Sequence, residues 1–513
     1  MSGGATTSPV NASSYVLALD IGTSSVRAML FDARGDAVQD VHIQRSYPLT
    51  TTAAGEVTVD ADMLAGVVCE AIDAALRAAG DRAGQIAGVA TDTFWHSLIA
   101  VDASGRPLTP VITWADTRAR DASAALRQQF DTAAIHLRTG APLHTSYWPA
   151  RMRWFADTRP DILTSAANFL SFGEYLHRRV LGRSVCSLCM ASATGLFATQ
   201  ARTWDLDLAR ALGVRPEQLP ALGDLRDALH GLTPDFALRW PALRDTPWFP
   251  AIGDGAAANV GSGCAGDGRV ALTVGTSSAV RVLTPARGVV PPDGLWLYLL
   301  DASRAVLGGA LSEGGNVLAW LERTLRIEDL ASAEKEAASL APDGHGLTIL
   351  PFIAGERSLG WHGEARGTIA GVSVHTTPAD VLRAALEALA YRITAVYERL
   401  EDSLKSQPAV TQTGAARDQR TAGVVGSGGA LLGSPLFQQI VADTLGAPLS
   451  PSRDSEASAR GAALLALEAL GLIGNVADVA PRLAAAIQPD PARTPLYRAA
   501  MRRQEDLYRR LLG

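Results

Sequence analysis

Two stretches of this sequence decide its fold: Asp20-Ile-Gly-Thr-Ser-Ser-Val-Arg27 and Thr273-Val-Gly-Thr-Ser-Ser-Ala-Val-Arg281. Each contains Gly-Thr-Ser-Ser, and each joins two apolar runs of the kind that form β-strands. The copies lie about half of the 513-residue chain apart. Chance recurrence of a common turn is the alternative, but matching strand contexts favour an internal duplication. The repeat therefore predicts two similar domains, each opening with a β-hairpin that has Gly-Thr-Ser at its tip.

The residues around each copy predict a mixed α/β layout. Apolar spacing typical of an amphipathic helix runs from 60 to 79 and stops at Gly80. Strands are expected at 15–20, 26–31, 37–47, 86–90, 97–101, 269–274, 279–283, 295–300, 305–309 and 347–352. Further helices are expected within 116–243 and at 316–325, 379–403, 436–445 and 457–470. The polar stretch 406–422 is typical of an exposed loop.

Composition excludes several classes of protein. Net charge is -6 and 19% of residues are charged, which leaves no basic footprint for nucleic acid. The chain has no run of 18 apolar residues that would predict a transmembrane helix. Residues 1–14 are small and polar, so we expect a loose tail there and not a signal peptide. Four cysteines form no disulfide framework, and a cytoplasmic location is expected.

Lysine usage narrows the ways in which this chain could bind phosphate. Of 46 basic residues only Lys335 and Lys405 are lysine, and neither follows a Gly-rich loop. A P-loop needs Gly-Lys-Ser/Thr, and a protein kinase needs a lysine on a specific strand. Both schemes are excluded, so a phosphate would have to be bound by backbone N–H groups, hydroxyls, arginines or a metal ion.

The two Gly-Thr-Ser turns are candidates for that task. Glycines at positions 22 and 275 allow close backbone approach and positive φ angles, and Thr23, Ser24 and Thr276 add hydroxyl donors. Successive N–H groups in such turns form anion-binding nests, so two facing turns would hold a polyphosphate from both sides. Asp20 precedes only the first turn, where it would bind Mg²⁺ or cap the turn.

Two further stretches are candidates, each with a structural alternative. Asp254 follows a short apolar run and precedes a small-residue stretch, so it is either a general base toward a substrate hydroxyl or a helix N-cap. Gly428 and Gly429 join a strand to a helix, where they either admit a flat base or form an ordinary connection. Gly261-Ser-Gly-Cys-Ala-Gly266 and Cys186-Ser-Leu-Cys189 match dinucleotide and metal patterns only by their letters, because neither has the required context.

The ordered set of motifs resembles the FGGY carbohydrate kinases of the actin-like ATPase superfamily. The two Gly-Thr-Ser-Ser copies resemble the family's two phosphate motifs, and 428–435 resembles its adenosine motif. The resemblance covers about Val16 to Leu472, nearly the whole chain. Within the family the sequence is most similar to gluconate kinases, over 95–102, 113–118, 137–144, 191–197, 308–320 and 351–357.

The resemblance implies two duplicated actin-like (ribonuclease H-like) domains with a nucleotide cleft between them. It divides the chain into a tail over 1–14, a sugar-binding domain over 15–260, a nucleotide-binding domain over 261–475 and a helical extension over 476–513. It further implies roles for individual residues: Asp254 as catalytic base, Asp20 beside the metal, Trp95 and His96 beside the sugar, and Gly22, Thr23, Ser24, Gly275, Thr276, Gly315, Gly429 and Ala430 beside the nucleotide.

The implied activity is transfer of the γ-phosphoryl group of ATP, with Mg²⁺, to a hydroxyl of a small sugar or sugar acid. A gluconate-like substrate is favoured, and its carboxylate would require an arginine, for which Arg118, Arg138 and Arg151 are candidates. A homodimer is a further expectation. The sequence departs from gluconate kinases at Asp92-Thr-Phe-Trp95, around Gly-Asp254-Gly and after Arg357. A kinase for another polyol or ketose, and an actin-like switch module, are the alternatives.

Overall fold

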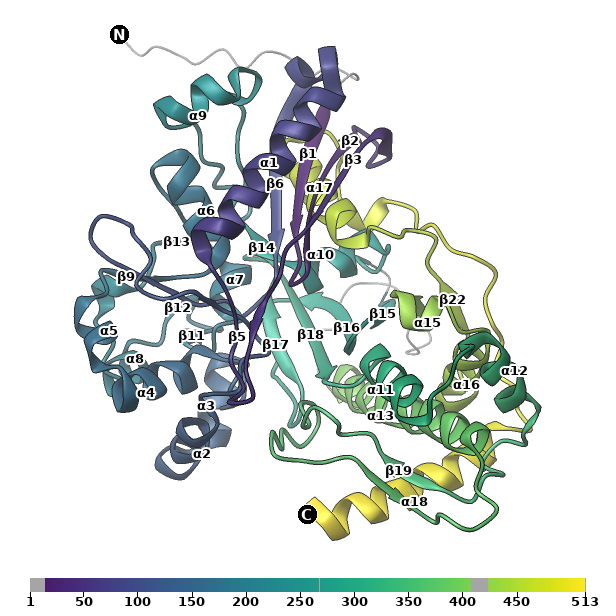
Figure 1. The fold of residues 1–513 in the computed structure, drawn as a ribbon. Coiled ribbons are helices and arrows are strands. Elements are labelled where there is room, and N and C mark those ends of the chain that lie inside the picture. The colour runs from purple at the N-terminus through teal and green to yellow at the C-terminus, as the bar shows by residue number, and fades with distance from the viewer. Residues whose placement is uncertain (1–13, 267, 407–422, 513) are drawn as a thin grey trace.

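The computed structural model describes residues 14–266, 268–406 and 423–512. Its N-terminal half is built on a sheet with strand order β14-β6-β1-β2-β3, which Figure 1 shows in purple and teal beside helix α1 (Ala61–Ala79). The buried faces of β1 and β2 are almost entirely apolar, as the sequence pattern predicts. The strands of this sheet are β1 (Tyr15–Ile21), β2 (Ser25–Asp32), β3 (Ala37–Ser46), β6 (Ile86–Thr93) and β14 (Ile252–Gly253).

The C-terminal half repeats this topology. Its sheet has the order β17-β18-β16-β15-β21-β22, in which a β15–β16 hairpin and two parallel neighbours match β1–β2, β6 and β14. The predicted duplication of an α/β domain is therefore confirmed. The strands of this sheet are β15 (Val270–Val274), β16 (Ser278–Pro285), β17 (Trp296–Leu299), β18 (Arg304–Leu311), β21 (Val424–Ser427) and β22 (Leu449–Pro451).

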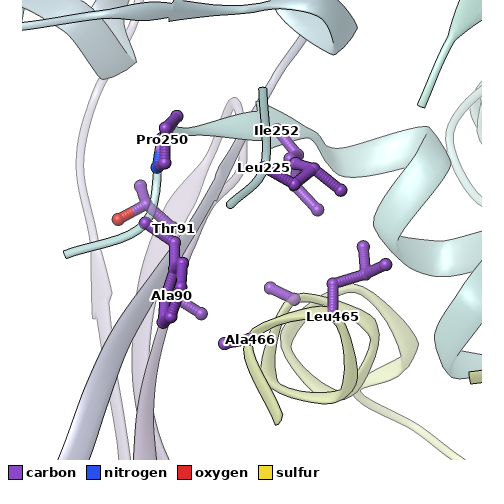
Figure 2. Close-up of a pocket in the computed structure, with 9 residues that line it drawn as sticks. Ala90, Thr91, Leu225, Pro250, Ile252, Leu465 and Ala466 are labelled. Carbon is purple, nitrogen blue, oxygen red and sulfur yellow. The ribbon is translucent and has the colours of Figure 1, made fainter. Parts of the chain in front are cut away.

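Helices α10 (Asp254–Gly261) and α17 (Ala457–Ala469) join the two halves. A Cβ on Gly261 would strike the carbonyl oxygen of Ala457, and a Cβ on Gly461 would strike that of Ala257. The crossing therefore needs glycine on both helices because their backbones touch there. Although α17 comes late in the sequence, it packs against β1 and β6, and Figure 2 shows Leu465 and Ala466 facing Ala90 and Ile252 across a small apolar cavity.

Between β6 and β14 the chain forms a large insertion of short elements. The sequence pattern identified its helical character and the strand at 97–101, which is β7, but not its other two- and three-residue strands, which are too short to show a periodicity. The elements of this region are β7 (Ile99–Val101), β8 (Val111–Ile112), α2 (Arg120–Gln129), α3 (Thr132–Thr139), α4 (Trp148–Thr158), α5 (Pro160–Ser165), β9 (Asn168–Leu170), α6 (Phe172–Leu181), β10 (Cys186–Ser187), α7 (Leu188–Ser192), β11 (Phe197–Ala198), β12 (Thr203–Trp204), α8 (Leu206–Ala211), β13 (Leu222–Gly223) and α9 (Pro234–Arg239). Earlier in the chain lie two further short strands, β4 (Thr50–Thr51) and β5 (Val57–Val59).

Three of the remaining helices, α13 (Pro378–Ser406), α15 (Gly429–Leu432) and α16 (Pro435–Leu445), pack against the C-terminal sheet. Helices α11 (Gly315–Leu325), α12 (Leu330–Ser339) and α18 (Thr494–Leu512) pack against α13, and α18 also contacts strand β19 (Thr348–Leu350), which pairs with β20 (Thr368–Ala370). The expected loop at 406–422 lies almost wholly outside the described residues, as does the expected tail.

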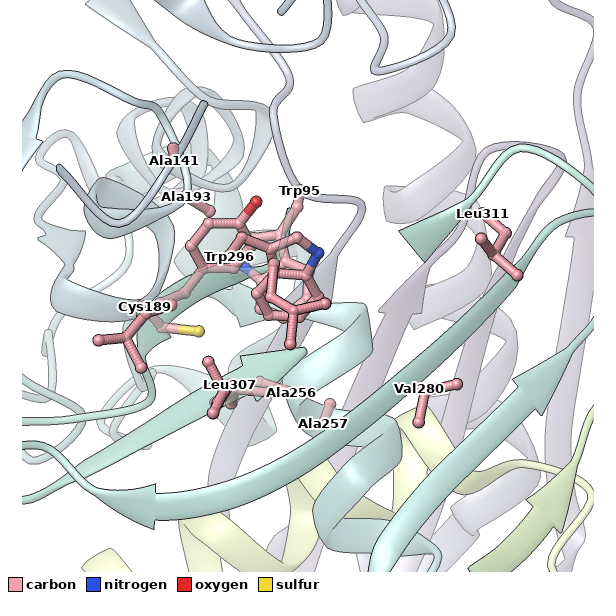
Figure 3. Close-up of a cluster of buried hydrophobic side chains, with 14 of the residues drawn as sticks. Trp95, Ala141, Cys189, Ala193, Ala256, Ala257, Val280, Trp296, Leu307 and Leu311 are labelled. Atoms are coloured by element: carbon pink, nitrogen blue, oxygen red, sulfur yellow. The ribbon is translucent and has the colours of Figure 1, made fainter. Parts of the chain in front are cut away.

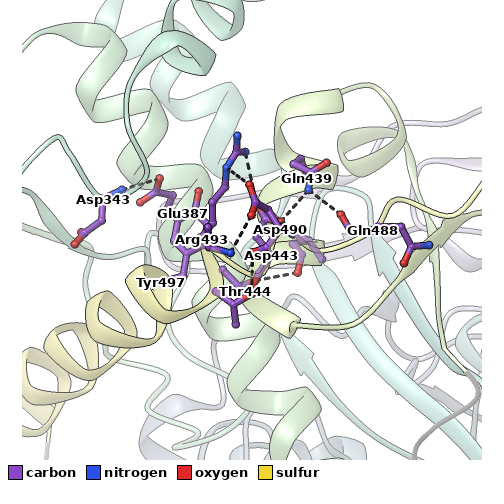
Figure 4. Close-up of polar contacts among 12 residues, drawn as sticks. Asp343, Glu387, Gln439, Asp443, Thr444, Gln488, Asp490, Arg493 and Tyr497 are labelled. Carbon is purple, nitrogen blue, oxygen red and sulfur yellow. Dashed lines mark hydrogen bonds and ion pairs between the residues drawn. The ribbon is translucent and has the colours of Figure 1, made fainter.

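The segment after 476 is helical only in part. Apart from a single 3₁₀ turn at Val476–Asp478, helix begins only at Thr494. Between these points Asp490 donates its backbone N–H to Asp443 of α16 at 2.7 Å and forms an ion pair with Arg493 (Figure 4). Asp443 is fully buried in the C-terminal half. The bonds from Asp490 and its neighbours therefore attach the C-terminal segment to the interior of that half.

Candidate active site

The two Gly-Thr-Ser turns close equivalent hairpins. Ile21 pairs with Val26 across the first turn, and Val274 pairs with Ser278 across the second. Each turn is closed by its own glycine, whose N–H donates to Ser25 in the first and to Ser277 in the second. The expectation of positive φ angles at Gly22 and Gly275 is wrong, because neither glycine lies in the left-handed region. A Cβ on Gly275 would meet nothing within 4 Å, so the fold leaves open space beside that turn.

A cavity of about 300 Å³ brings the two turns to one place. Thr23 lines it from the N-terminal half, while Gly275 and Thr276 line it from the C-terminal half. Three further residues with expected roles, Trp95, His96 and Asp254, line the same cavity. Gly22, Ser24, Asp20, Gly315, Gly429 and Ala430 are not among its lining residues.

The expected nucleotide residues of the C-terminal half form a second group beside that cavity. Gly315 donates its N–H to the carbonyl oxygen of Gly275 at 2.7 Å, and a Cβ on Gly315 would contact Ala430 at 3.1 Å. A Cβ on Gly429 would meet nothing within 4 Å. Gly428 differs, because its φ of 90° and the nearby backbone of Val274 both require glycine there. The N-terminus of α11 and the loop before α15 thus adjoin the second turn.

Asp254 is placed by β14 and begins helix α10. Gly253 is the N-cap, so the alternative assignment of Asp254 as the N-cap is wrong. Burial, and next the charge of Asp20, raise the pKa of Asp254 to about 6, while Arg281 and the N–H of Gly255 oppose the shift. A carboxylate that titrates near 6 is largely ionised at neutral pH and still basic enough to accept a proton.

Asp20 and Asp92 form a pair of buried carboxylates at the ends of adjacent parallel strands. The β1–β6 register sets these two residues opposite one another. Burial raises the pKa of both groups, and the charges of Asp20 and Asp254 add to the rise at Asp92. Arg27 bonds Asp20 at 3.2 Å, whereas Asp92 has no nitrogen donor within the described ranges and shares a proton with the Asp20 carboxyl. Paired buried carboxyl oxygens fit a hard divalent cation, which prefers oxygen ligands.

One side of the cavity is aromatic. The Trp95 ring is 5.2 Å from that of Tyr298 and 5.7 Å from that of Trp296, which stacks on Tyr298. Figure 3 shows Trp95 and Trp296 close together in the buried apolar cluster, with Ala256 and Ala257 of α10 and Leu307 of β18 below them in this view. Flat apolar walls of this kind suit the C–H faces of a carbohydrate while polar groups contact its hydroxyls.

Two departures from the gluconate kinase pattern, Trp95 before the histidine and the short Gly-Asp254-Gly segment, lie in contact with one another. A Cβ on Gly253 or on Gly255 would strike the Trp95 indole. The large ring at 95 therefore requires glycine on both sides of Asp254, and the two unusual features of the sequence compensate one another. The catalytic candidate is held against an indole face rather than within a longer segment.

His96 is oriented toward the cavity with a fixed tautomer. Its Nδ1 is 2.6 Å from the carbonyl oxygen of Ala193, which requires the proton on Nδ1 and leaves Nε2 as an acceptor. Burial, and next the charge of Arg357, lower the pKa of His96 well below its usual value. Its φ of 66° is strained for a non-glycine residue, a feature common at functional positions.

The three arginines suggested as carboxylate partners are all engaged elsewhere, and none lines the cavity. Arg118 forms ion pairs with Asp116 and Glu56, and Arg138 forms one with Asp205. Arg151 is buried and donates to backbone carbonyl oxygens.

Sequence reasoning missed several residues at the site. Asp92, Arg281, Tyr298 and Trp296 received no role, and Arg357 appeared only within a matching stretch. The pairing of Asp92 with Asp20 depends on the β1–β6 register, for which a single sequence gives no signal. Gly261 of the first chance motif lies at the α10–α17 crossing, and Cys186 and Cys189 of the second are buried with free thiols.

One group of metal-type ligands lies away from this site. Asp343, His345 and Glu387 have ligand atoms within 4.8 Å of one another (Figure 4 labels the two acids). Glu387 already accepts hydrogen bonds from Arg383, His345 and Tyr391. This cluster is a satisfied structural network. No helix in the described part of the chain is long and apolar enough to cross a membrane.

Comparison with known proteins agrees with the division of the fold into two halves. Residues 15–261 match the N-terminal domain of the FGGY family of carbohydrate kinases, and residues 270–470 match its C-terminal domain. The chain is 26% identical to a gluconokinase of Bacillus subtilis strain 168, over 93% of this chain and 92% of that protein. It is 31% identical to a glycerol kinase of Acidovorax ebreus, over 91% of this chain and 92% of that protein.

Two solved structures share the fold. A gluconate kinase from Lactobacillus acidophilus aligns with a TM-score of 0.87 at 24% identity, covering 97% of this chain and 98% of that one. A ligand-bound xylulose kinase from the same organism aligns with a TM-score of 0.88 at 23% identity, covering 98% and 99%. At these identities the likeness establishes the architecture and not the substrate.

Proposed function

This chain belongs to the FGGY family of carbohydrate kinases, and from that premise we propose that it phosphorylates a gluconate-like sugar acid with ATP. As a member of that family it is a phosphotransferase that acts on an alcohol group. The similarity to gluconokinases over almost the whole chain supports the choice of acceptor. One observation carries the assignment of the site: Asp254 lines the same cavity as Thr23 of the first turn and Thr276 of the second.

In the proposed mechanism Asp254 is the general base. Its carboxylate accepts the proton of the acceptor hydroxyl as that oxygen attacks the γ-phosphorus, and ADP leaves. Backbone N–H groups and hydroxyls of the two turns hold the phosphates from opposite halves. Closure of the halves about α10 and α17 excludes water and limits wasteful hydrolysis of ATP.

Asp20 and Asp92 are the residues proposed to hold Mg²⁺, directly or through water. The ion would neutralise charge on the transferring phosphoryl group. Ser24, Gly22, Gly315, Gly429 and Ala430 remain proposed nucleotide residues, and Trp95 and His96 remain proposed contacts of the sugar. The homodimer stays a prediction.

A kinase for a neutral polyol or ketose is the second candidate. It is favoured by the 31% identity to glycerol kinase, which exceeds the 26% identity to gluconokinase. Family membership argues against the third alternative, an actin-like switch module without phosphoryl transfer.

A coupled assay of ADP release over aldonates, polyols and ketoses tests the proposal. We expect kcat/KM to be highest for gluconate or another aldonate of similar length. A higher kcat/KM for glycerol or xylulose would replace the sugar acid by the second candidate, and nucleotide binding without any acceptor-dependent ADP release would contradict kinase activity itself.

A further inference from the structure

Arg357 is a cation on the substrate side of the cavity without an anionic partner. It lines the cavity, and its side chain is largely buried, with 9% of the residue exposed. Within the described ranges no carboxylate forms an ion pair with it, and its Nε has no hydrogen-bond acceptor. Its guanidinium lies over the ring of Trp114, 5.3 Å from the centroid. A buried charge that is left unpaired costs free energy, so its retention indicates a ligand.

The neighbouring acids do not neutralise it. Glu356, the preceding residue, bonds Arg392 and accepts a hydrogen bond from Tyr508 at 2.8 Å. Glu313 is fully buried, and burial raises its pKa to about 8, so it is mostly protonated at neutral pH. The positive charge of Arg357, together with that of Arg392, opposes the rise at Glu313 without overcoming it, and it also reaches two neutral histidines, His96 and His144.

The second arginine of the cavity has different surroundings. Arg281 donates to the hydroxyl of Thr273 at 2.8 Å and faces the charge of Asp254. It therefore lies with the phosphate turn and the base, where the transferring group would be. Arg357 lies with Trp114, His96 and Tyr298, the aromatic and imidazole side chains of the acceptor region.

The backbone of Arg357 is fixed on both sides. Ser358 donates its N–H to Ala310 of β18 at 2.9 Å, and Trp361 donates its N–H to the carbonyl oxygen of Arg357 at 2.7 Å. The Trp361 indole in turn donates to Gly294 at 3.0 Å. The backbone that carries the guanidinium is thus held in position before any ligand binds, and the Trp114 ring lies against the guanidinium itself, which favours bidentate recognition of a planar anion.

We propose that Arg357 binds the carboxylate of the acceptor and so selects sugar acids over neutral polyols and ketoses. The inference rests on the proposed function and specifies the residue by which the site recognises its substrate class. None of the arginines that the sequence suggested takes this role, because none of them lines the cavity and all three have partners within the protein.

The test compares gluconate with glucitol, which differs by a neutral CH₂OH in place of the carboxylate. We expect Arg357→Met to lower kcat/KM for gluconate by about a hundredfold or more, as for a lost charge-assisted bidentate contact. The value for glucitol, taken from turnover or from its inhibition constant, should change by less than about threefold. Arg357→Lys, which keeps the charge without the fork, should lie between.

Arg239→Met is the matched control. Arg239 also stacks on a tryptophan, 5.6 Å from the ring of Trp240, but pairs with Asp73 far from the cavity residues. Its variant should keep the wild-type preference for gluconate. Unchanged thermal melting and ATP binding in Arg357→Met would show that it folds.

The outcomes separate the inference from the proposed function. Equal losses for gluconate and glucitol in Arg357→Met, or no loss for gluconate, would overturn the role of Arg357 while leaving a sugar-acid kinase in place. A wild-type enzyme that neither binds nor phosphorylates an aldonate would overturn both. If Arg357→Met fails to fold, the gluconate-to-glucitol ratio of Arg357→Lys decides in the same way.

Discussion

The two repeats of this molecule place different chemistry at the same positions of the same fold. In the N-terminal half, Asp20 of β1 lies opposite Asp92 of β6. In the C-terminal half the corresponding register sets Thr273 opposite Ser427, and their hydroxyls are 3.1 Å apart. One repeat therefore presents two carboxylates where the other presents two hydroxyls. Duplication supplied the framework, and side-chain divergence gave the first half the groups suited to cations and protons.

The arginines on the second strands both connect the two halves. Arg27 of β2 pairs with Asp20 of its own half at 3.2 Å and with Glu456 of the C-terminal half at 2.9 Å. Arg281 of β16 bonds Thr273 and directs its charge across the cavity toward Asp254 of the other half. The acidic half is thus partly balanced by a cation from its duplicate, and the reactive centre exists only where both repeats meet.

Of the substitutions considered, removal of the proposed base should lower the catalytic rate the most. We expect Asp254→Asn to lower kcat by at least about a hundredfold, since general-base catalysis typically contributes 10²–10⁴-fold. ATP binding, measured by calorimetry, should stay near the wild-type value because the amide keeps the shape of the side chain. A variant that keeps half of the wild-type rate would remove Asp254 from the chemistry.

The carboxylate pair gives the next prediction. Asp20→Ala should raise the Mg²⁺ concentration needed for half-maximal rate by at least about tenfold, because a hard cation loses an oxygen ligand. Thr273→Val, at the equivalent position of the other repeat, should shift that midpoint by less than about twofold. Equal shifts in the two variants would show that the repeats do not divide the work as proposed.

The pH dependence tests the electrostatic link between the halves. With the pKa of Asp254 raised to about 6, the base is ionised above that pH and protonated below it. The kcat/KM for the carbohydrate should therefore fall about tenfold per unit as pH drops below this value. Arg281 lowers that pKa, so Arg281→Met should move the acidic limb to higher pH. If the pH at which kcat/KM begins to fall is the same in Arg281→Met as in the wild type, a group other than Asp254 controls this pH dependence.

The fold and some of the candidate site residues could be predicted from the sequence, because local patterns along the chain indicate them. Long apolar runs and helical spacing predict β1, β2 and α17, and the family resemblance singles out Asp254. What sequence reasoning missed depends on contacts between distant segments. The partnership of Asp20 with Asp92 is set by strand register, and the fit of Trp95 to Gly253 brings together an insertion boundary and a helix start. Arg357 became distinct from other arginines only when their ion pairs were known.

The turn glycines give the smallest expected effect and the finest test of the comparison. Gly275 has an ordinary φ and open space around its missing Cβ, whereas Gly428 beside it has a φ of 90° and touches the backbone of Val274. Gly275→Ala should leave the melting temperature unchanged and weaken ATP binding by about three- to tenfold, since the added methyl meets only the ligand. Gly428→Ala should lower the melting temperature itself, because it strains the backbone whether or not ATP is present. If Gly275→Ala instead destabilises the apo protein and leaves the Kd for ATP unchanged, the second turn is structural, and the two repeats do not hold one polyphosphate between them.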